Sequence, residues 1–84
     1  MIRYTVVWQK QTEADLANIW NEGVDRNAIA EAANRIDSEL AVDAHMKGTL
    51  VSERSRELCV DPLHIMFRVD QMDRRVDVYR ISRV

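Results

Sequence analysis

The segment from Arg56 to Arg83 constrains the fold most, because it has the pattern of a three-strand antiparallel meander. In its middle, apolar residues alternate with mostly polar ones, which is the period-two pattern of a half-buried strand. The apolar positions are Leu63, Ile65, Phe67 and Val69. Pro62 precedes this strand and lacks a backbone donor, so it fits a connection to the strand before it.

The last strand of the meander carries an irregularity. A polar break at residues 71–73 precedes Val76, Val78 and Ile81, so the apolar spacing changes from two residues to three. A single extra residue in one strand produces such a step and re-aims a side chain. We therefore predict a β-bulge near Tyr79 or Arg80.

The first half of the chain predicts one strand followed by two short helices. Residues 2–8 alternate with apolar side chains on both faces, which favours a central strand. Thr12 is predicted to cap the first helix, with Glu13 and Asp15 in the first turn and Gly23 as its end.

Asp25 is predicted to cap the second helix. Its apolar residues keep helical spacing at Ile29, Ala32 or Ala33, Ile36 and Leu40. Two amphipathic helices joined by so few residues are expected to pack as an antiparallel hairpin. We interpret residues 43–52, which have weak periodicity, as a loop of about ten residues.

These elements predict one α+β domain over residues 1–84, in the order β-α-α-β-β-β. The helical hairpin would pack on the dry face of a small, mostly antiparallel sheet. Trp8, Trp20 and Phe67 are expected in the core, and Cys59 is expected to be a small buried residue.

Composition narrows the function classes. The chain contains no apolar run near the roughly 20 residues that span a bilayer, and we expect no membrane association. Its single cysteine excludes an internal disulfide and offers no zinc-binding spacing, which favours a reducing compartment, the cytoplasm. We expect no cofactor and no metal. The net charge of −2 argues against a simple nucleic-acid binder.

Charge is nevertheless unevenly distributed. Residues 53–84 hold seven basic and six acidic side chains, and all seven basic ones are arginines. The planar guanidinium suits phosphate or carboxylate, so this half could meet a polyanion or an acidic partner. The alternative is a solvated surface of salt-bridged arginines, which contributes little to stability.

The order and residues of these elements together resemble the RelE/ParE superfamily of type II toxin–antitoxin toxins. The opening "YTVVWQKQTEADLANIW" is similar to the family's first strand and its helix with an alanine–aspartate–leucine core, here Ala14, Asp15 and Leu16. "RELCVDPLHIMFRVD" resembles the family's arginine-x-leucine strand, turn and aliphatic–aromatic strand. "RRVDVYRISRV" resembles its last strand.

The resemblance implies a growth-inhibiting toxin held inactive by a cognate antitoxin. RelE-like members cleave messenger RNA on the ribosome, whereas ParE-like members inhibit DNA gyrase. By resemblance, the catalytic candidates for RNA cleavage are Arg56, Tyr79, Arg80 and Arg83, with His45 and His64 as the other groups that titrate near neutrality. Apolar side chains of the antitoxin would anchor on exposed parts of Leu16, Ile29 or Ile36.

The chain departs from the family pattern in three ways. Leu63 and His64 stand where many members carry an arginine after the turn. Ser82 and Arg83 stand where the family often has histidine–arginine, followed by a tail with a tyrosine, and the net charge is acidic rather than basic. Two alternatives to a nuclease therefore stay open. One is a non-enzymatic inhibitor of gyrase, and the other is a degenerate toxin that only binds its antitoxin.

Overall fold

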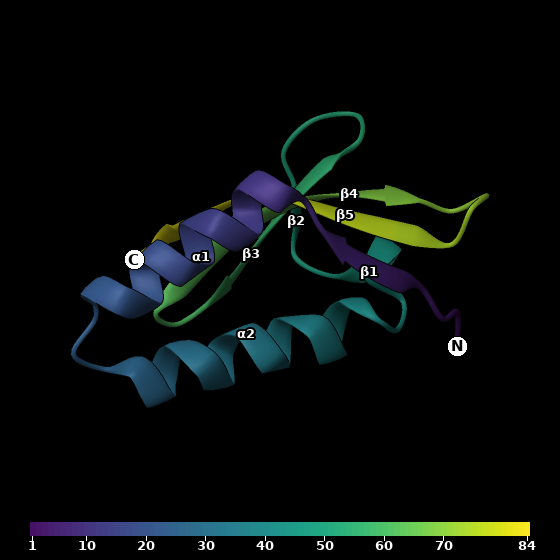
Figure 1. Cartoon of the computed structure of the whole chain (residues 1–84). Coiled ribbons are helices and arrows are strands. Elements are labelled where there is room, and N and C mark those ends of the chain that lie inside the picture. The colour runs from purple at the N-terminus through teal and green to yellow at the C-terminus, as the bar shows by residue number, and fades with distance from the viewer.

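The C-terminal meander is present as predicted. In a computed structural model that describes residues 1–84, three consecutive antiparallel strands form the centre of the sheet (Figure 1). They are β3 (Ser55–Val60), β4 (Leu63–Asp70) and β5 (Arg75–Arg83). Asp61 and Pro62 connect β3 to β4, which confirms the position inferred for the proline.

The predicted bulge lies in β5. Met66 pairs with Arg80 and the next residue, Phe67, pairs with Val78, so Tyr79 is left without a partner on β4. The extra residue keeps the apolar side chains before and after it on the same face of the sheet. Val76, Val78 and Ile81 are consequently all buried.

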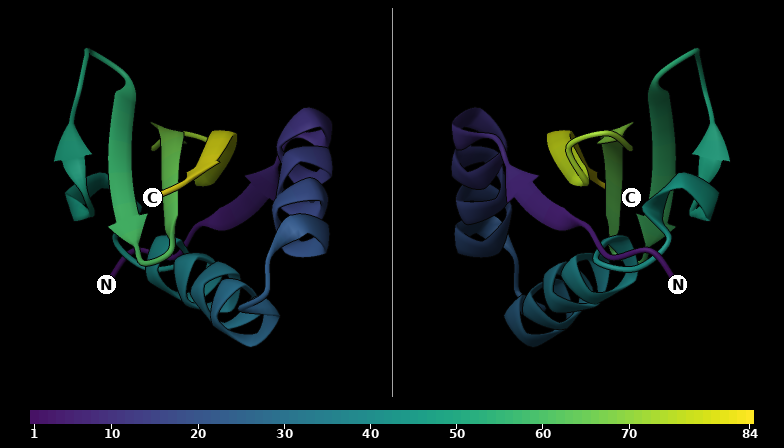
Figure 2. Two further views of the ribbon diagram at one scale, coloured as in Figure 1. Left: turned by 90° about the vertical axis from the view of Figure 1, so that its left-hand side faces the viewer. Right: turned by 90° about the vertical axis from the view of Figure 1, so that its right-hand side faces the viewer.

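The first strand is not central. β1 (Thr5–Trp8) pairs in parallel with β5, and the strand order β1-β5-β4-β3-β2 places it at one edge. β3 and β5 occupy both sides of β4, and the short strand Thr49–Leu50 pairs with the outer side of β3, so the outer side of β5 is left for β1. Only one of its faces is dry: Val6 packs against the core, whereas Val7 is exposed. The helix after it, α1, lies beside β1 at the same edge of the sheet, away from β2 (Figure 2).

The first helix begins earlier than predicted. α1 spans Lys10–Glu22, and its N-cap residue is Gln9, whose side chain makes no capping bond. The predicted Thr12 cap is therefore wrong. The backbone N–H of Gln9 donates to the carbonyl of Val78 at 3.0 Å, so the helix starts where β1 leaves β5. Thr12 instead lies inside the helix and is 1% exposed.

The connection between the helices follows the sequence more closely. α1 ends at Gly23, as predicted, and a Cβ at that position would approach Ile29 Cδ1 to 2.6 Å. α2 spans Arg26–Leu40 with Asp25 at the predicted N-cap position. Its carboxylate forms no capping bond: Oδ2 accepts a hydrogen bond from Arg83 at 2.7 Å, and the buried Oδ1 has no partner in the chain.

The core lies between α2 and the dry face of the sheet. Four residues of α2 are buried there: Ile29, Ala32, Ile36 and Leu40. They face six buried residues of the meander: Leu63, Ile65, Phe67, Val76, Val78 and Ile81. This arrangement confirms the predicted helical hairpin on one face of the sheet. We call the other face, which no helix covers, the open face (Figure 2).

The segment predicted as a loop contains local structure. A 3-10 turn, η1 (Ala44–Met46), precedes a two-residue strand, β2 (Thr49–Leu50), which pairs with β3. Contacts that are distant in sequence hold this segment in place. Lys47 Nζ forms a 2.9 Å ion pair with Glu39 Oε2 of α2, and that ammonium group lowers the pKa of the Glu39 carboxyl. The loop prediction is therefore wrong for residues 44–46 and 49–50.

Candidate functional site

The four residues that the resemblance suggests for catalysis do not share one face of the sheet. Arg56 pairs with the buried Phe67 and Arg83 pairs with the buried Leu63, so both start from the helix-covered face. Arg80 pairs with Met66, which points to the open face. The bulge turns Tyr79 to the open face as well, beside Arg68.

Arg56 is bonded to the backbone of a neighbouring segment. Its Nε donates to the carbonyl of Lys47 at 2.7 Å, and one terminal nitrogen is 3.4 Å from the carbonyl of Gly48. These bonds tie the segment before β2 to β3. They also use N–H groups of the guanidinium that would otherwise be free to donate hydrogen bonds to a phosphate.

Arg83 has a partner in the connection between the helices. Its terminal nitrogen donates to Asp25 Oδ2 at 2.7 Å. This hydrogen bond lowers the pKa of the Asp25 carboxyl, and the carboxylate in turn raises the pKa of Arg83. Arg83 therefore connects the end of β5 to the start of α2.

Tyr79 is held from two sides on the open face. Its hydroxyl donates to Ser55 Oγ at 3.0 Å, and the guanidinium carbon of Arg68 lies 4.3 Å from the centre of its ring. Such cation–π contacts contribute about 0.5–1 kcal/mol when exposed. The ring is thus fixed in position, with Arg80 as its neighbour along β5.

Three further arginines lie together at the far end of the open face. A shallow depression of about 590 Å³ lies there, and Arg54, Arg68 and Arg75 line it together with Asp70 and Asp77. Arg75 is paired with Asp77 at 3.2 Å. Positive and negative groups nearly balance in this depression. Arg80 lies outside it and forms no ion pair with any carboxylate of the chain.

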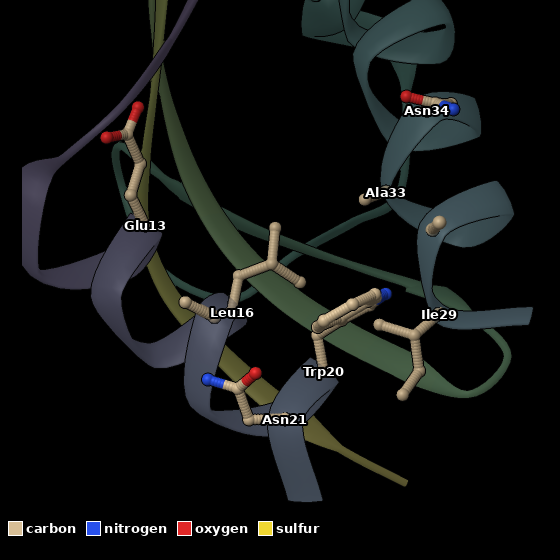
Figure 3. Close-up of a pocket in the computed structure, with 9 residues that line it drawn as sticks. Glu13, Leu16, Trp20, Asn21, Ile29, Ala33 and Asn34 are labelled. Carbon is tan, nitrogen blue, oxygen red and sulfur yellow. The ribbon is translucent and has the colours of Figure 1, made fainter. Parts of the chain in front are cut away.

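An apolar groove between the two helices is the second candidate site (Figure 3). It has a volume of about 420 Å³ and its walls include Leu16 and Trp20 of α1 and Ile29 and Ala33 of α2. Glu13, Asn21 and Asn34 stand at its rim (Figure 3).

The groove corrects two expectations. Trp20 is not a core residue, because 41% of it is exposed, and the guanidinium carbon of Arg26 lies 4.6 Å from the centre of its ring. Ile29 and Ile36 are both completely buried, so neither has the exposed part that was expected to receive an anchor from a partner. Leu16 lines the groove with part of its side chain accessible, and the buried Ile29 forms part of its wall. Helical spacing alone does not show that the helices diverge enough to leave Trp20 accessible.

Two further residues differ from their expected roles. Cys59 is exposed on β3, because its position in the strand turns it to the open face. His45 lies in η1, where its Nδ1 is 2.9 Å from the hydroxyl of the buried Tyr4. His45 therefore contacts the start of the chain, and it also lines a small hollow together with Arg54 and Arg56. No helix has the length and apolar character needed to cross a bilayer, and no cluster of three or more potential metal ligands occurs.

Solved structures share this architecture. A chain of the toxin–antitoxin complex RelBE2 from Mycobacterium tuberculosis superposes with a TM-score of 0.78 and 16% identity, over 100% of this chain and 94% of that one. A chain of the chromosomal ParDE toxin–antitoxin system from P. aeruginosa gives a TM-score of 0.70 and 22% identity, over 100% and 99% of the two chains. The conserved hypothetical protein HP0892 from Helicobacter pylori gives 0.59 and 15%, over 95% and 93%.

The chain therefore has the same fold as these solved structures, which is the fold that the sequence motifs suggested. No protein-family model matches the sequence, and no curated protein is significantly similar to it. Function has to be argued from the open face and the groove, because one fold hosts different activities.

Proposed function

We propose that this protein is the toxin of a type II toxin–antitoxin pair, which arrests growth in the cytoplasm and is neutralised by a cognate antitoxin. The apolar groove between α1 and α2 is the observation that supports binding of an antitoxin. It exposes Trp20 and Leu16 beside small alanines, a combination that fits the apolar side chains of a partner segment. The likeness to chains of RelBE2 and ParDE supports the same conclusion.

Two exposed alanines of α2 allow a matched test of the groove. Ala30 lines it, whereas Ala28 is exposed outside it. Ala30→Arg places a charge among apolar side chains and is expected to weaken binding of the antitoxin at least tenfold, or about 1.4 kcal/mol. Ala28→Arg is expected to bind normally. Equal affinities of the two variants for the product of the neighbouring gene would exclude the groove as its site.

The toxic activity that we propose is ribosome-dependent cleavage of messenger RNA at the open face. Of the four residues suggested by resemblance, we assign this role to Tyr79 and Arg80, and we assign Arg56 and Arg83 a structural role. Arg80 supports the assignment because its guanidinium is exposed and forms no ion pair within the chain, so it is available for a phosphate. Arg68 and Ser55 would hold the Tyr79 ring beside it.

Induced expression followed by primer extension on a reporter message tests the nuclease. Growth arrest with codon-phased cuts is expected for the wild type, and Arg80→Ala is expected to abolish both. Arg75→Ala is the matched control, because Arg75 lies on the same strand and is already paired with Asp77. Arrest with an intact message would exclude the nuclease.

Inhibition of DNA gyrase is the second candidate function. The net charge of −2 and the 22% identity with a chain of the ParDE system favour it. A purified toxin that stops supercoiling by gyrase and leaves messages intact would establish this candidate. Expression without any growth defect would support the third alternative, a degenerate toxin that only binds its antitoxin.

A further inference from the structure

The open face carries a second group of polar side chains, near the turn between β3 and β4. His64 of β4 stands between its cross-strand partners Cys59 of β3 and Ser82 of β5. In the next outward-facing row, Met66 stands between Glu57 and Arg80. These side chains face outward because the residues on either side of His64 in the strand, Leu63 and Ile65, are buried.

His64 is oriented by a carboxylate. Its Nε2 lies 3.1 Å from Glu57 Oε2, and the two side chains are 29% and 44% exposed. An ionised carboxylate only accepts hydrogen bonds, so this contact places a proton on Nε2. In the neutral imidazole, Nδ1 then carries the free lone pair. A carboxylate fixes the tautomer of the histidine base in the same way in serine hydrolases.

Arg80 stands diagonally across from His64 on the neighbouring strand. Because His64 pairs with Ser82, Arg80 is its neighbour two residues along β5. Diagonal neighbours in an antiparallel pair are about 7–8 Å apart. A phosphodiester fits this spacing: the guanidinium can donate to its non-bridging oxygens while the imidazole reaches the adjacent 2′-hydroxyl.

We propose that His64 is the general base of RNA cleavage by this toxin, that Glu57 is its positioning residue, and that Arg80 binds the scissile phosphate. The assignment rests on the nuclease function proposed above. Nδ1 of His64 takes the proton of the 2′-hydroxyl, and the 2′-oxygen attacks phosphorus. The bond from phosphorus to the 5′-oxygen breaks, and that oxygen takes a proton from water. The products are a 2′,3′-cyclic phosphate and a 5′-hydroxyl.

Single-turnover cleavage of message on purified ribosomes, with toxin in excess, tests the assignment. His64→Ala is expected to slow cleavage about 10²- to 10⁴-fold, the usual contribution of a general base. Added imidazole is expected to restore part of the rate to His64→Ala but not to Arg80→Ala. A purely structural role of His64 would not give such rescue.

Two more variants separate positioning from folding. Glu57→Gln is expected to lower the rate at saturating toxin, by less than His64→Ala does, without changing the toxin concentration that gives half of that rate. Cys59→Ser, at the cross-strand neighbour of His64, is expected to cleave like the wild type.

The outcomes distinguish this assignment from the nuclease itself. If the wild type cuts and His64→Ala cuts equally fast, the assignment is wrong and the nuclease stands. If His64→Ala is slow but imidazole does not restore it, the role as a base is also wrong. If the wild type leaves the message intact, both the nuclease function and the role of His64 as a general base are excluded.

Discussion

The two faces of the sheet use the same residue type in different ways. On the helix-covered face, Arg56 and Arg83 are both bonded within the chain, one to backbone carbonyls and the other to Asp25. On the open face, Arg68 lies over an aromatic ring and Arg80 has no ion-pair partner. The comparison indicates that both arginines on the helix-covered face hold the fold together, whereas on the open face Arg80 is left available to a ligand.

The largest expected effect on stability comes from comparing two consecutive residues of β4. Phe67 is completely buried against the helices, and Met66 points to the open face. Phe67→Ala is expected to lower the free energy of unfolding by about 3–5 kcal/mol, because it removes contacts and leaves a cavity. Met66→Ala is expected to cost less than about 1 kcal/mol. Urea denaturation of both variants measures the difference, and similar losses would contradict the assignment of the faces.

The second test compares arginines from opposite faces. Arg56→Ala leaves the carbonyls of Lys47 and Gly48 without their donor, and we expect a loss of about 1–3 kcal/mol in the free energy of unfolding. Arg80→Ala is expected to change it by less than about 0.5 kcal/mol. Hydrogen exchange is expected to show that residues 44–50 lose protection only in Arg56→Ala. A destabilised Arg80→Ala would show that the open face is also structural.

The third test removes a buried hydroxyl group from α1, which packs on the helix-covered face. The hydroxyl of Thr12 is buried and has no hydrogen-bond partner in the chain. Thr12→Val keeps the shape of the side chain and is expected to stabilise the fold by up to about 1 kcal/mol. Thermal unfolding measures the gain. A loss of stability would mean that the hydroxyl finds a partner in solution, and Thr12→Ser, which keeps the hydroxyl, is the control for packing.

The smallest effect concerns the ion pair between Asp25 and Arg83. Because the pKa of Asp25 is lower in the folded protein, the pair stabilises the fold above about pH 4, the ordinary range of an aspartate. This contribution is lost as the pH falls through the lowered pKa. Asp25→Asn is therefore expected to be less stable than the wild type at neutral pH, and the gap is expected to close in acid.

Denaturation of both proteins between about pH 2 and 7 measures that gap. Asp73→Asn, which alters an exposed carboxylate that forms no ion pair in the chain, is the control for removing a surface charge. A gap between Asp25→Asn and the wild type that stays constant down to the lowest pH would show that the ion pair does not stabilise the fold.

The sequence predicts the elements that depend on local patterns. The alternation in residues 63–69, the changed spacing before Ile81 and the glycine at position 23 each have one physical cause, and the structure confirms all three. The edge position of β1 and the start of α1 depend instead on pairing with β5, which is about 70 residues away in the chain. Local pattern cannot show such pairing.

Less of the candidate site could be predicted. The sequence identifies the arginines but not the face on which each one starts, because the bulge at Tyr79 shifts that assignment for every residue after it. It also does not reveal the contact between Glu57 and His64, because these residues are brought together only by the register of β3 and β4. Trp20 was predicted to be in the core because its helical spacing is that of a buried stripe.

The parallel pairing of β1 with β5 has a consequence for how the chain is made. β5 supplies three buried residues to the core and the only neighbour of β1, yet the ribosome makes it after every other strand. Until residues 75–83 emerge, β1 has no strand to pair with and the layer under α2 is incomplete. The nascent chain therefore acquires these surfaces, including Arg80 on the open face, only after residues 75–83 have emerged. The antitoxin proposed above would therefore find these surfaces complete only once residues 75–83 have been made.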